Sequence, residues 1–146
     1  MTSETYSKLV PEPTPETAPY WDGLNEQRLV LQKCGECGKI RHYPRPVCDS
    51  CFSMDVTWAE ATGDGKIHSW TITHHAFHPG YISELPYVLV TVDLNEGVRM
   101  QAALLADPET PLKVGLPVQL RFDRATPDLT LPVFVLDDKA NAEDNQ

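Results

Sequence analysis

The stretch Leu31–Cys51, LQKCGECGKIRHYPRPVCDSC, decides the fold of this chain. It holds two Cys-x-x-Cys pairs, separated by ten residues, that together use all 4 cysteines of the sequence. Each pair can place two thiolates on one side of a tight turn, and two such turns facing each other form a tetrahedral cage of sulfurs. A closed cage of this kind is typical of structural zinc, so we expect the ligands to be Cys34, Cys37, Cys48 and Cys51.

The sequence around the two pairs favours a metal over other uses of cysteine. Gly35 and Gly38 let the backbone fold over a metal at the first pair, whereas Asp49, Ser50 and Phe52 stand at the matching places of the second. A redox Cys-x-x-Cys needs only one pair in a thioredoxin-like setting. Two disulfides would need an oxidising compartment, and no secretion signal opens the sequence. Four-sulfur ligation also suits iron, which stays the alternative metal.

Length and charge limit the classes of function. The 146 residues give room for one ordinary domain plus a small module, and the net charge of -9 argues against a general nucleic-acid binder. No apolar run is long enough to span a membrane, so we expect a cytoplasmic protein. Positive side chains nevertheless gather around the cysteines, either as a solvated face or as a site for a phosphate-bearing ligand or an acidic partner. They are Arg28, Lys33, Lys39, Arg41 and Arg45.

Residues 1–30 are expected to form an arm and a short docking helix. The first 19 residues are rich in Pro, Thr and Glu, which predicts a flexible or extended arm. Trp21 and Leu24 are spaced by three, and Pro19 suits a first turn, so a helix is predicted from about Pro19 to Gln27. Its apolar side chains serve either to dock a partner or to pack on the chain's own barrel. At the other end, residues 137–146 are expected to form a disordered acidic tail.

Between residues 54 and 136 the hydrophobic periodicity is that of β-strands. The run Gly63-Asp64-Gly65 predicts a turn into a strand, and residues 85–94 and 98–104 form an antiparallel hairpin around Asn95–Gly97. Further strands are predicted at 114–122 and 131–136. This count fits a five- to six-stranded barrel of the OB type. The expected core is Trp58, Ile67, Trp70, Ile72, Val88, Val90, Val92, Met100, Ala102, Leu104, Val118, Leu120, Phe122, Val133 and Val135.

The order of these motifs resembles the bacterial and archaeal family called "domain of unknown function 35". The likeness runs from about Tyr20 to Phe122, and its sharpest pieces are the four cysteines, the run Tyr43-Pro44-Arg45-Pro46, and Gly63, Gly65, Pro86, Tyr87, Gly97 and Gly115. The resemblance implies a mainly β chain with a short N-terminal helix. It also implies a rubredoxin-like zinc ribbon at 31–53 and a C-terminal OB-fold domain at 54–136.

The resemblance further implies a non-catalytic accessory subunit of an acyl-CoA-processing complex. Family members pair with thiolase-fold proteins, including thiolases, thiolase-like aldolases and archaeal hydroxymethylglutaryl-CoA synthase systems, or with MaoC-like enoyl-CoA hydratases. In such hetero-oligomers the zinc is structural, and the OB domain bridges the partners or shapes the path of the CoA thioester. The family has no agreed catalytic residues, so none are assigned here and only the four cysteines are carried over as ligands.

The residues themselves offer few candidates for catalysis or ligand binding. The sequence contains no Gly-x-Ser-x-Gly, His-Glu-x-x-His or phosphate-cradling glycine loop. Two interpretations are open for His74, His78 and Tyr81. They line a ligand or partner surface near the middle strands of the barrel, or they are surface or half-buried side chains without a functional role at a strand end and loop. Arg41 and Arg45 are candidates for contact with CoA phosphates.

Two other functions remain open from the sequence. An OB fold can bind nucleic acid through stacking aromatics, for which Trp70, Phe77 and Tyr81 are available, but this region carries little positive charge. A general protein-interaction module without a ligand is the second alternative. The identity of the partner protein distinguishes the latter from the acyl-CoA complex.

Overall fold

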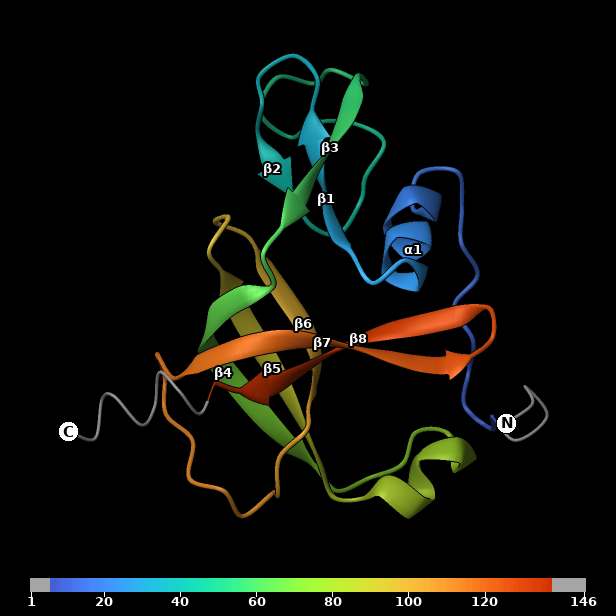
Figure 1. Cartoon of the computed structure of the whole chain (residues 1–146), viewed down its shortest axis with the longest axis vertical. Helices are drawn as coiled ribbons and strands as arrows, with labels where there is room; N and C mark the ends of the chain where they lie inside the picture. The colour runs from blue at the N-terminus through green and yellow to red at the C-terminus, as the bar shows by residue number, and fades with distance from the viewer. Residues whose placement is uncertain (1–5, 138–146) are drawn as a thin grey trace.

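The computed structural model describes residues 6–137, which form a small three-stranded ribbon beside a closed five-stranded barrel (Figure 1). The predicted mainly β fold with one short helix is therefore confirmed. The first five residues of the arm, and the expected acidic tail beyond residue 137, lie outside the described residues. No helix in the described part is long and apolar enough to cross a membrane.

Helix α1 (Ala18–Asn25) packs on its own chain. It begins with Pro19 in its first turn, and it buries Tyr20, Gly23 and Leu24 against strand β1 (Leu29–Cys34) and strand β8 (Leu129–Leu136). A Cβ at Gly23 would lie 3.1 Å from the carbonyl oxygen of Arg28, so glycine allows the chain to turn back closely onto the helix. Of the two roles left open for this helix, packing on the chain itself is thus observed.

The ribbon sheet has the strand order β2-β1-β3, with β2 at Ile40–Arg41 and β3 at Val56–Ala61, and β1 pairs antiparallel with both. Strand β3 runs along the whole of β1, from Leu29↔Ala61 to Cys34↔Val56. The sheet that carries the ribbon therefore extends to Ala61, beyond the range of 31–53 expected for the ribbon itself. This pairing brings the chain from the cysteines directly to the first barrel strand.

The barrel closes in the order β4-β5-β6-β8-β7, in which β6 and β8 are parallel and the other pairs are antiparallel. The remaining strands are β4 (Asp64–Thr73), β5 (Tyr87–Leu94), β6 (Arg99–Leu104) and β7 (Pro117–Thr126), and the 3₁₀ turn η2 (Pro79–Glu84) lies between β4 and β5. This is the order of an OB fold. The predicted β5–β6 hairpin is confirmed, with Val90 opposite Ala102.

The core follows the predicted alternation except in two places. In β8, Phe134 and Leu136 belong to the core cluster, although Val133 and Val135 were expected there. Val133 is buried on the opposite face of the strand, so the predicted face was wrong by one residue. Trp70 was also expected inside, but it is 36% exposed and lies outside the core cluster.

Candidate metal centre and adjoining surfaces

The four cysteines meet at the end of the ribbon that is far from the barrel. One sulfur from each of Cys34, Cys37, Cys48 and Cys51 lies within 4.8 Å of all the others, with Sγ–Sγ distances of 3.5 Å between Cys34 and Cys51 and 3.6 Å between Cys37 and Cys48. All four are free of disulfides. Four thiols at this spacing fit a tetrahedral metal ion and leave no open position for a substrate.

Backbone amides point at the sulfurs in both turns. The N–H groups of Glu36 and Cys37 donate to Sγ of Cys34 at 3.4 and 3.5 Å, and the N–H of Ser50 donates to Sγ of Cys48 at 3.4 Å. The backbone N–H groups of Cys37 and Glu36 lower the pKa of Cys34 to about 6. The backbone also lowers the pKa of Cys48, through Cys51 and Ser50. These N–H groups stabilise thiolates, which is the form that binds a metal.

The two turns share one backbone conformation despite their different sequences. Gly38 and Phe52 each follow the second cysteine of their pair, and both have positive φ values, 78° and 64°. Glycine adopts this left-handed conformation freely, but phenylalanine does so with strain. The Phe52 side chain is 77% exposed, so the core gains nothing from it.

Arg41 is held inside the ribbon. It is 2% exposed, and it donates to Oε1 of Gln32 at 2.6 Å and to the carbonyl oxygen of Arg45 at 3.1 Å. The same Oε1 accepts the backbone N–H of Arg45 at 2.7 Å. The partners of this buried cation are therefore neutral, and its position ties β1 to the segment that leads to the second cysteine pair.

A basic hollow of about 360 Å³ separates the ribbon from the β5–β6 turn. Lys39, Arg45 and Arg99 line it, together with the carboxylates of Asp49 and Asp93. Lys39 lies 2.9 Å from Asp49 and Arg99 lies 2.8 Å from Asp93, while Arg45 is 3.9 Å from Asp49. Counting buried Arg41, which also lines the hollow, cations outnumber carboxylates here, in contrast to the chain as a whole.

The three candidates from the loop region are only partly brought together. The rings of His78 and Tyr81 meet edge to face at 6.4 Å, and Nδ1 of His78 accepts the N–H of Gly80 at 3.0 Å. His74 is exposed just beyond the end of β4. Tyr81 also lines a cavity that runs across the barrel strands.

A cavity of about 510 Å³ runs across strands β5 and β6, and we call it the tyrosine groove after Tyr20, Tyr43, Tyr81 and Tyr87, which line it. Strands 2 and 3 of an OB fold, with the loop before them, are its usual ligand-binding face. Here helix α1 and the ribbon supply the facing wall. The groove as a whole could not be predicted from the sequence, because its tyrosines come from three separate segments, and Tyr81 was the one tyrosine among the site candidates.

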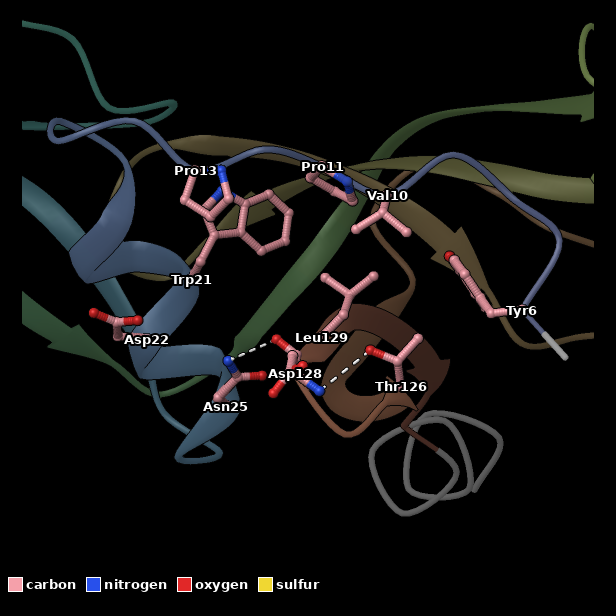
Figure 2. A pocket seen from close by; sticks show the side chains of 10 residues that line it. All are labelled: Tyr6, Val10, Pro11, Pro13, Trp21, Asp22, Asn25, Thr126, Asp128 and Leu129. Carbon is pink, nitrogen blue, oxygen red and sulfur yellow. Dashed lines mark hydrogen bonds between the residues drawn. The ribbon is translucent and has the colours of Figure 1, made fainter. Parts of the chain in front are cut away.

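A second hollow, of about 480 Å³, lies between the arm, helix α1 and the β7–β8 turn (Figure 2). Pro11 and Pro13 of the arm lie on one side of it and Leu129 of β8 on the other, while the Asn25 side chain donates to the carbonyl oxygen of Asp128 at 3.1 Å. Farther along the arm, Lys8 pairs with Glu84 at 2.6 Å. The described part of the arm is thus attached to the barrel.

Comparison with protein families gives two adjoining matches. Residues 21–57 match the model described as "ChsH2, rubredoxin-like zinc ribbon domain". Residues 58–123 match the model described as "ChsH2, C-terminal OB-fold domain". The two matches cover the ribbon with its four cysteines and most of the barrel.

Two curated relatives show how this likeness is distributed. The chain is 39% identical over 119 residues to a "Probable enoyl-CoA hydratase alpha subunit" of Thermomonospora curvata, covering 82% of this chain but only 37% of that subunit. It is 32% identical over 102 residues to a "DUF35 domain-containing scaffold protein" of Pyrococcus furiosus, covering 69% of this chain and 74% of the scaffold protein. The chain therefore spans little more than a third of the hydratase subunit, and most of the scaffold protein.

A solved structure gives a similar result. A chain of the "Ltp2-ChsH2(DUF35) aldolase" is 37% identical to this one with a TM-score of 0.79, and the match covers 87% of this chain and 98% of that chain. The similarity includes nearly the whole of the neighbour. It therefore extends over helix, ribbon and barrel together.

Proposed function

Because the chain belongs to the DUF35 family and carries the zinc-ribbon and OB-fold domains of ChsH2, we propose that it is an accessory subunit of an acyl-CoA-processing complex. Its partner in this proposal is a thiolase-fold protein that performs the carbon–carbon bond chemistry. The chain itself assists assembly and access of the CoA thioester, and it contributes no catalytic residue.

One observation carries this proposal. The match to a chain of the "Ltp2-ChsH2(DUF35) aldolase" covers 98% of that chain at 37% identity. Nearly all of that chain of the aldolase therefore has a counterpart in the protein. The match to a "DUF35 domain-containing scaffold protein" supports the same kind of role. A hydratase is the second candidate partner, because the most identical of the relatives described above is a hydratase alpha subunit.

We propose that Zn²⁺ is held by Cys34, Cys37, Cys48 and Cys51. The spacing of the four thiols and the amides aimed at Cys34 and Cys48 fit this ion. Bound zinc would fix the two turns of a ribbon whose own sheet is small, and binding of structural zinc is worth about 10–16 kcal/mol in isolated zinc-finger peptides. The ion's role in this proposal is structural.

We also propose that the basic hollow contacts the phosphates of the CoA thioester. Arg45 and Lys39 are exposed at its edge, and Arg99 faces them from the barrel. Arg41 lies deeper and contributes charge through its position behind Arg45. Salt-sensitive binding of free CoA that weakens in Arg45→Glu and Arg99→Glu, but not in Arg124→Glu on the exposed end of β7, would support this contact.

Co-expression with a thiolase-fold protein from the same genome tests the proposed function. We expect the two chains to co-elute as one species in size-exclusion chromatography, and to separate when Cys37→Ser removes a ribbon ligand. A parallel co-expression with a hydratase tests the second candidate. If neither protein co-elutes while the chain is folded and contains zinc, the proposed function is wrong.

A further inference from the structure

The tyrosine groove has the size and walls of a small-molecule site. Its volume of about 510 Å³ lies within the range of roughly 300–1,000 Å³ that is usual for ligand pockets. Helix α1 and the ribbon form one wall, and η2 and β5 form the other. Exposed Leu89 and Leu105 lie at its open side, where no other described part of the chain covers them.

The aromatic walls are fixed by contacts with one another. The ring of Tyr20 lies 5.1 Å from that of Trp21 and 5.5 Å from that of Tyr43, both edge to face. Nε1 of Trp21 donates to the hydroxyl of Tyr43 at 3.0 Å. On the opposite wall, the rings of Tyr81 and Tyr87 lie 5.9 Å apart. Walls that are held in place before binding reduce the entropic cost of receiving a ligand.

The groove offers little charge for an anion. Its cation, Lys8, lies 2.6 Å from the carboxylate of Glu84 and 5.2 Å from the centre of the Tyr81 ring, so its charge is already compensated. Asp123 adds a carboxylate at the edge. Burial, together with nearby Arg45, lowers the pKa of His42 to about 4, so this wall residue is neutral at pH 7. The groove therefore differs sharply from the basic hollow on the other side of His42.

Two polar side chains of the wall bear on the choice of ligand: His42, whose Nδ1 is buried without a partner among residues 6–137, and Tyr20. Tyr20 is 3% exposed, and its ring contacts those of Trp21, His42 and Tyr43. Burial raises the pKa of Tyr20, which keeps the hydroxyl protonated and able to donate. A protonated hydroxyl on the wall of the groove can donate to a ligand oxygen.

We propose that the tyrosine groove binds a neutral apolar ring or acyl group that carries a carbonyl or hydroxyl oxygen, with the hydroxyl of Tyr20 donating to that oxygen. The binding itself stands apart from the proposed function. Only the further identification of this group as the acyl part of the thioester rests on it. In that case the phosphates would lie at the basic hollow and the acyl group in the tyrosine groove, on the two sides of His42.

The test uses prodan, a neutral naphthalene that carries a propionyl ketone and whose fluorescence shifts to the blue in apolar surroundings. Titrating the full-length, zinc-loaded chain into prodan should give a saturable blue shift. Ala103→Trp, which fills the groove from β6, should abolish the shift, and Tyr20→Phe should weaken binding about five-fold, the effect of losing one hydrogen bond. Val114→Trp is the matched control, because it adds the same side chain at an exposed position outside the groove.

Each variant is first checked for zinc content and circular dichroism, and Leu105→Asp replaces Ala103→Trp if the latter does not fold. No saturable shift with the wild-type chain, or an equal shift with the groove-filling variant, overturns the proposal. If the wild-type chain does not bind prodan and Ala103→Trp no longer co-elutes with a partner, the groove is a protein contact instead. This result also overturns the proposal. If the chain binds prodan but co-elutes with neither candidate partner, the groove proposal stands and the proposed function is rejected.

Discussion

At the scale of single residues, Phe52 shows how the ribbon fixes its backbone without the usual residue. It has a φ of 64° at the position where the first turn has Gly38 with a φ of 78°. Ligation of a metal by Cys48 and Cys51, which precede Phe52, can hold such a conformation, although a Cβ makes it unfavourable. The free-energy cost of this conformation can be measured by comparing a variant that keeps the Cβ with one that removes it.

We predict that Phe52→Gly is more stable than Phe52→Ala by about 1 kcal/mol, because only the former removes the Cβ from a left-handed conformation. Gly38→Ala should lose a similar amount in the first turn. Urea unfolding of the zinc-loaded variants measures all three. Equal stability of the two Phe52 variants would show that the conformation at this position is not strained.

His42 should make stability depend on pH. Burial, and then Arg45, lower its pKa to about 4, whereas the unfolded chain has an ordinary value near 6.5. Between these values the unfolded chain binds the extra proton, so stability is complete above pH 6.5 and falls as the pH drops toward 4. The loss from pH 7 to pH 5 should be about 2 kcal/mol.

The pH effect is measured by urea unfolding of the zinc-loaded protein at several pH values. Release of zinc at low pH affects wild type and His42→Gln alike, so the difference between their slopes isolates the imidazole. His42→Gln should lack this share of the pH dependence. Parallel curves for the two proteins would contradict the burial of a neutral His42.

At the scale of elements, the ribbon contains a buried polar link in addition to its proposed metal site. Gln32 Oε1 accepts from Arg41 and from the backbone of Arg45, and Gln32 is 2% exposed. Gln32→Leu removes this acceptor and both of its hydrogen bonds and leaves a buried cation, which should cost about 2–4 kcal/mol. Gln32→Glu keeps an acceptor oxygen at this place and adds a countercharge, so it should retain most of the stability. Equal losses in thermal unfolding of the two variants would contradict this role of Gln32.

The metal-dependent part of the ribbon can be separated from the barrel by removing one ligand. Cys37→Ser should reduce the zinc content measured by mass spectrometry, and amides of the two turns should lose protection from hydrogen exchange. Barrel amides should keep theirs, because most of the core cluster lies in the barrel. Ser50→Ala is the control, since the backbone amide of Ser50, and not its side chain, donates to Cys48. Retention of zinc by Cys37→Ser would reject four-sulfur binding.

Individual elements also show what the sequence could and could not predict. The four cysteines were sufficient to predict the ribbon, and clean alternation was sufficient for β5 and β6, because each signal is local. In β8 the run Leu131–Leu136 is apolar throughout, so its inward face could not be chosen from the pattern. The structure turns Phe134 and Leu136 inward because β8 pairs with both β7 and β6, and Val133 is covered on the other face.

At the scale of the whole molecule, helix, ribbon and barrel together form surfaces that none of them has alone. The tyrosine groove needs Tyr20 from α1, Tyr43 from the ribbon, and Tyr81 and Tyr87 from the barrel. Sequence periodicity describes one element at a time and does not predict which side chains of different elements line the same groove. Helix α1 is central to it, because Tyr20 and Leu24 are also part of the core. Removing residues 1–28 would therefore unfold more than a docking element, and point variants are the cleaner test of partner contact.

In the proposed function this chain assists the chemistry of a partner. The most direct measurement compares the turnover of an acyl-CoA thioester by the purified thiolase-fold partner alone, by this chain alone, and by their equimolar mixture. We expect no turnover by this chain, a clear increase in the mixture over the partner alone, and no increase when the chain carries Cys37→Ser. Turnover by this chain alone, or equal rates with and without it, would rule out the accessory role.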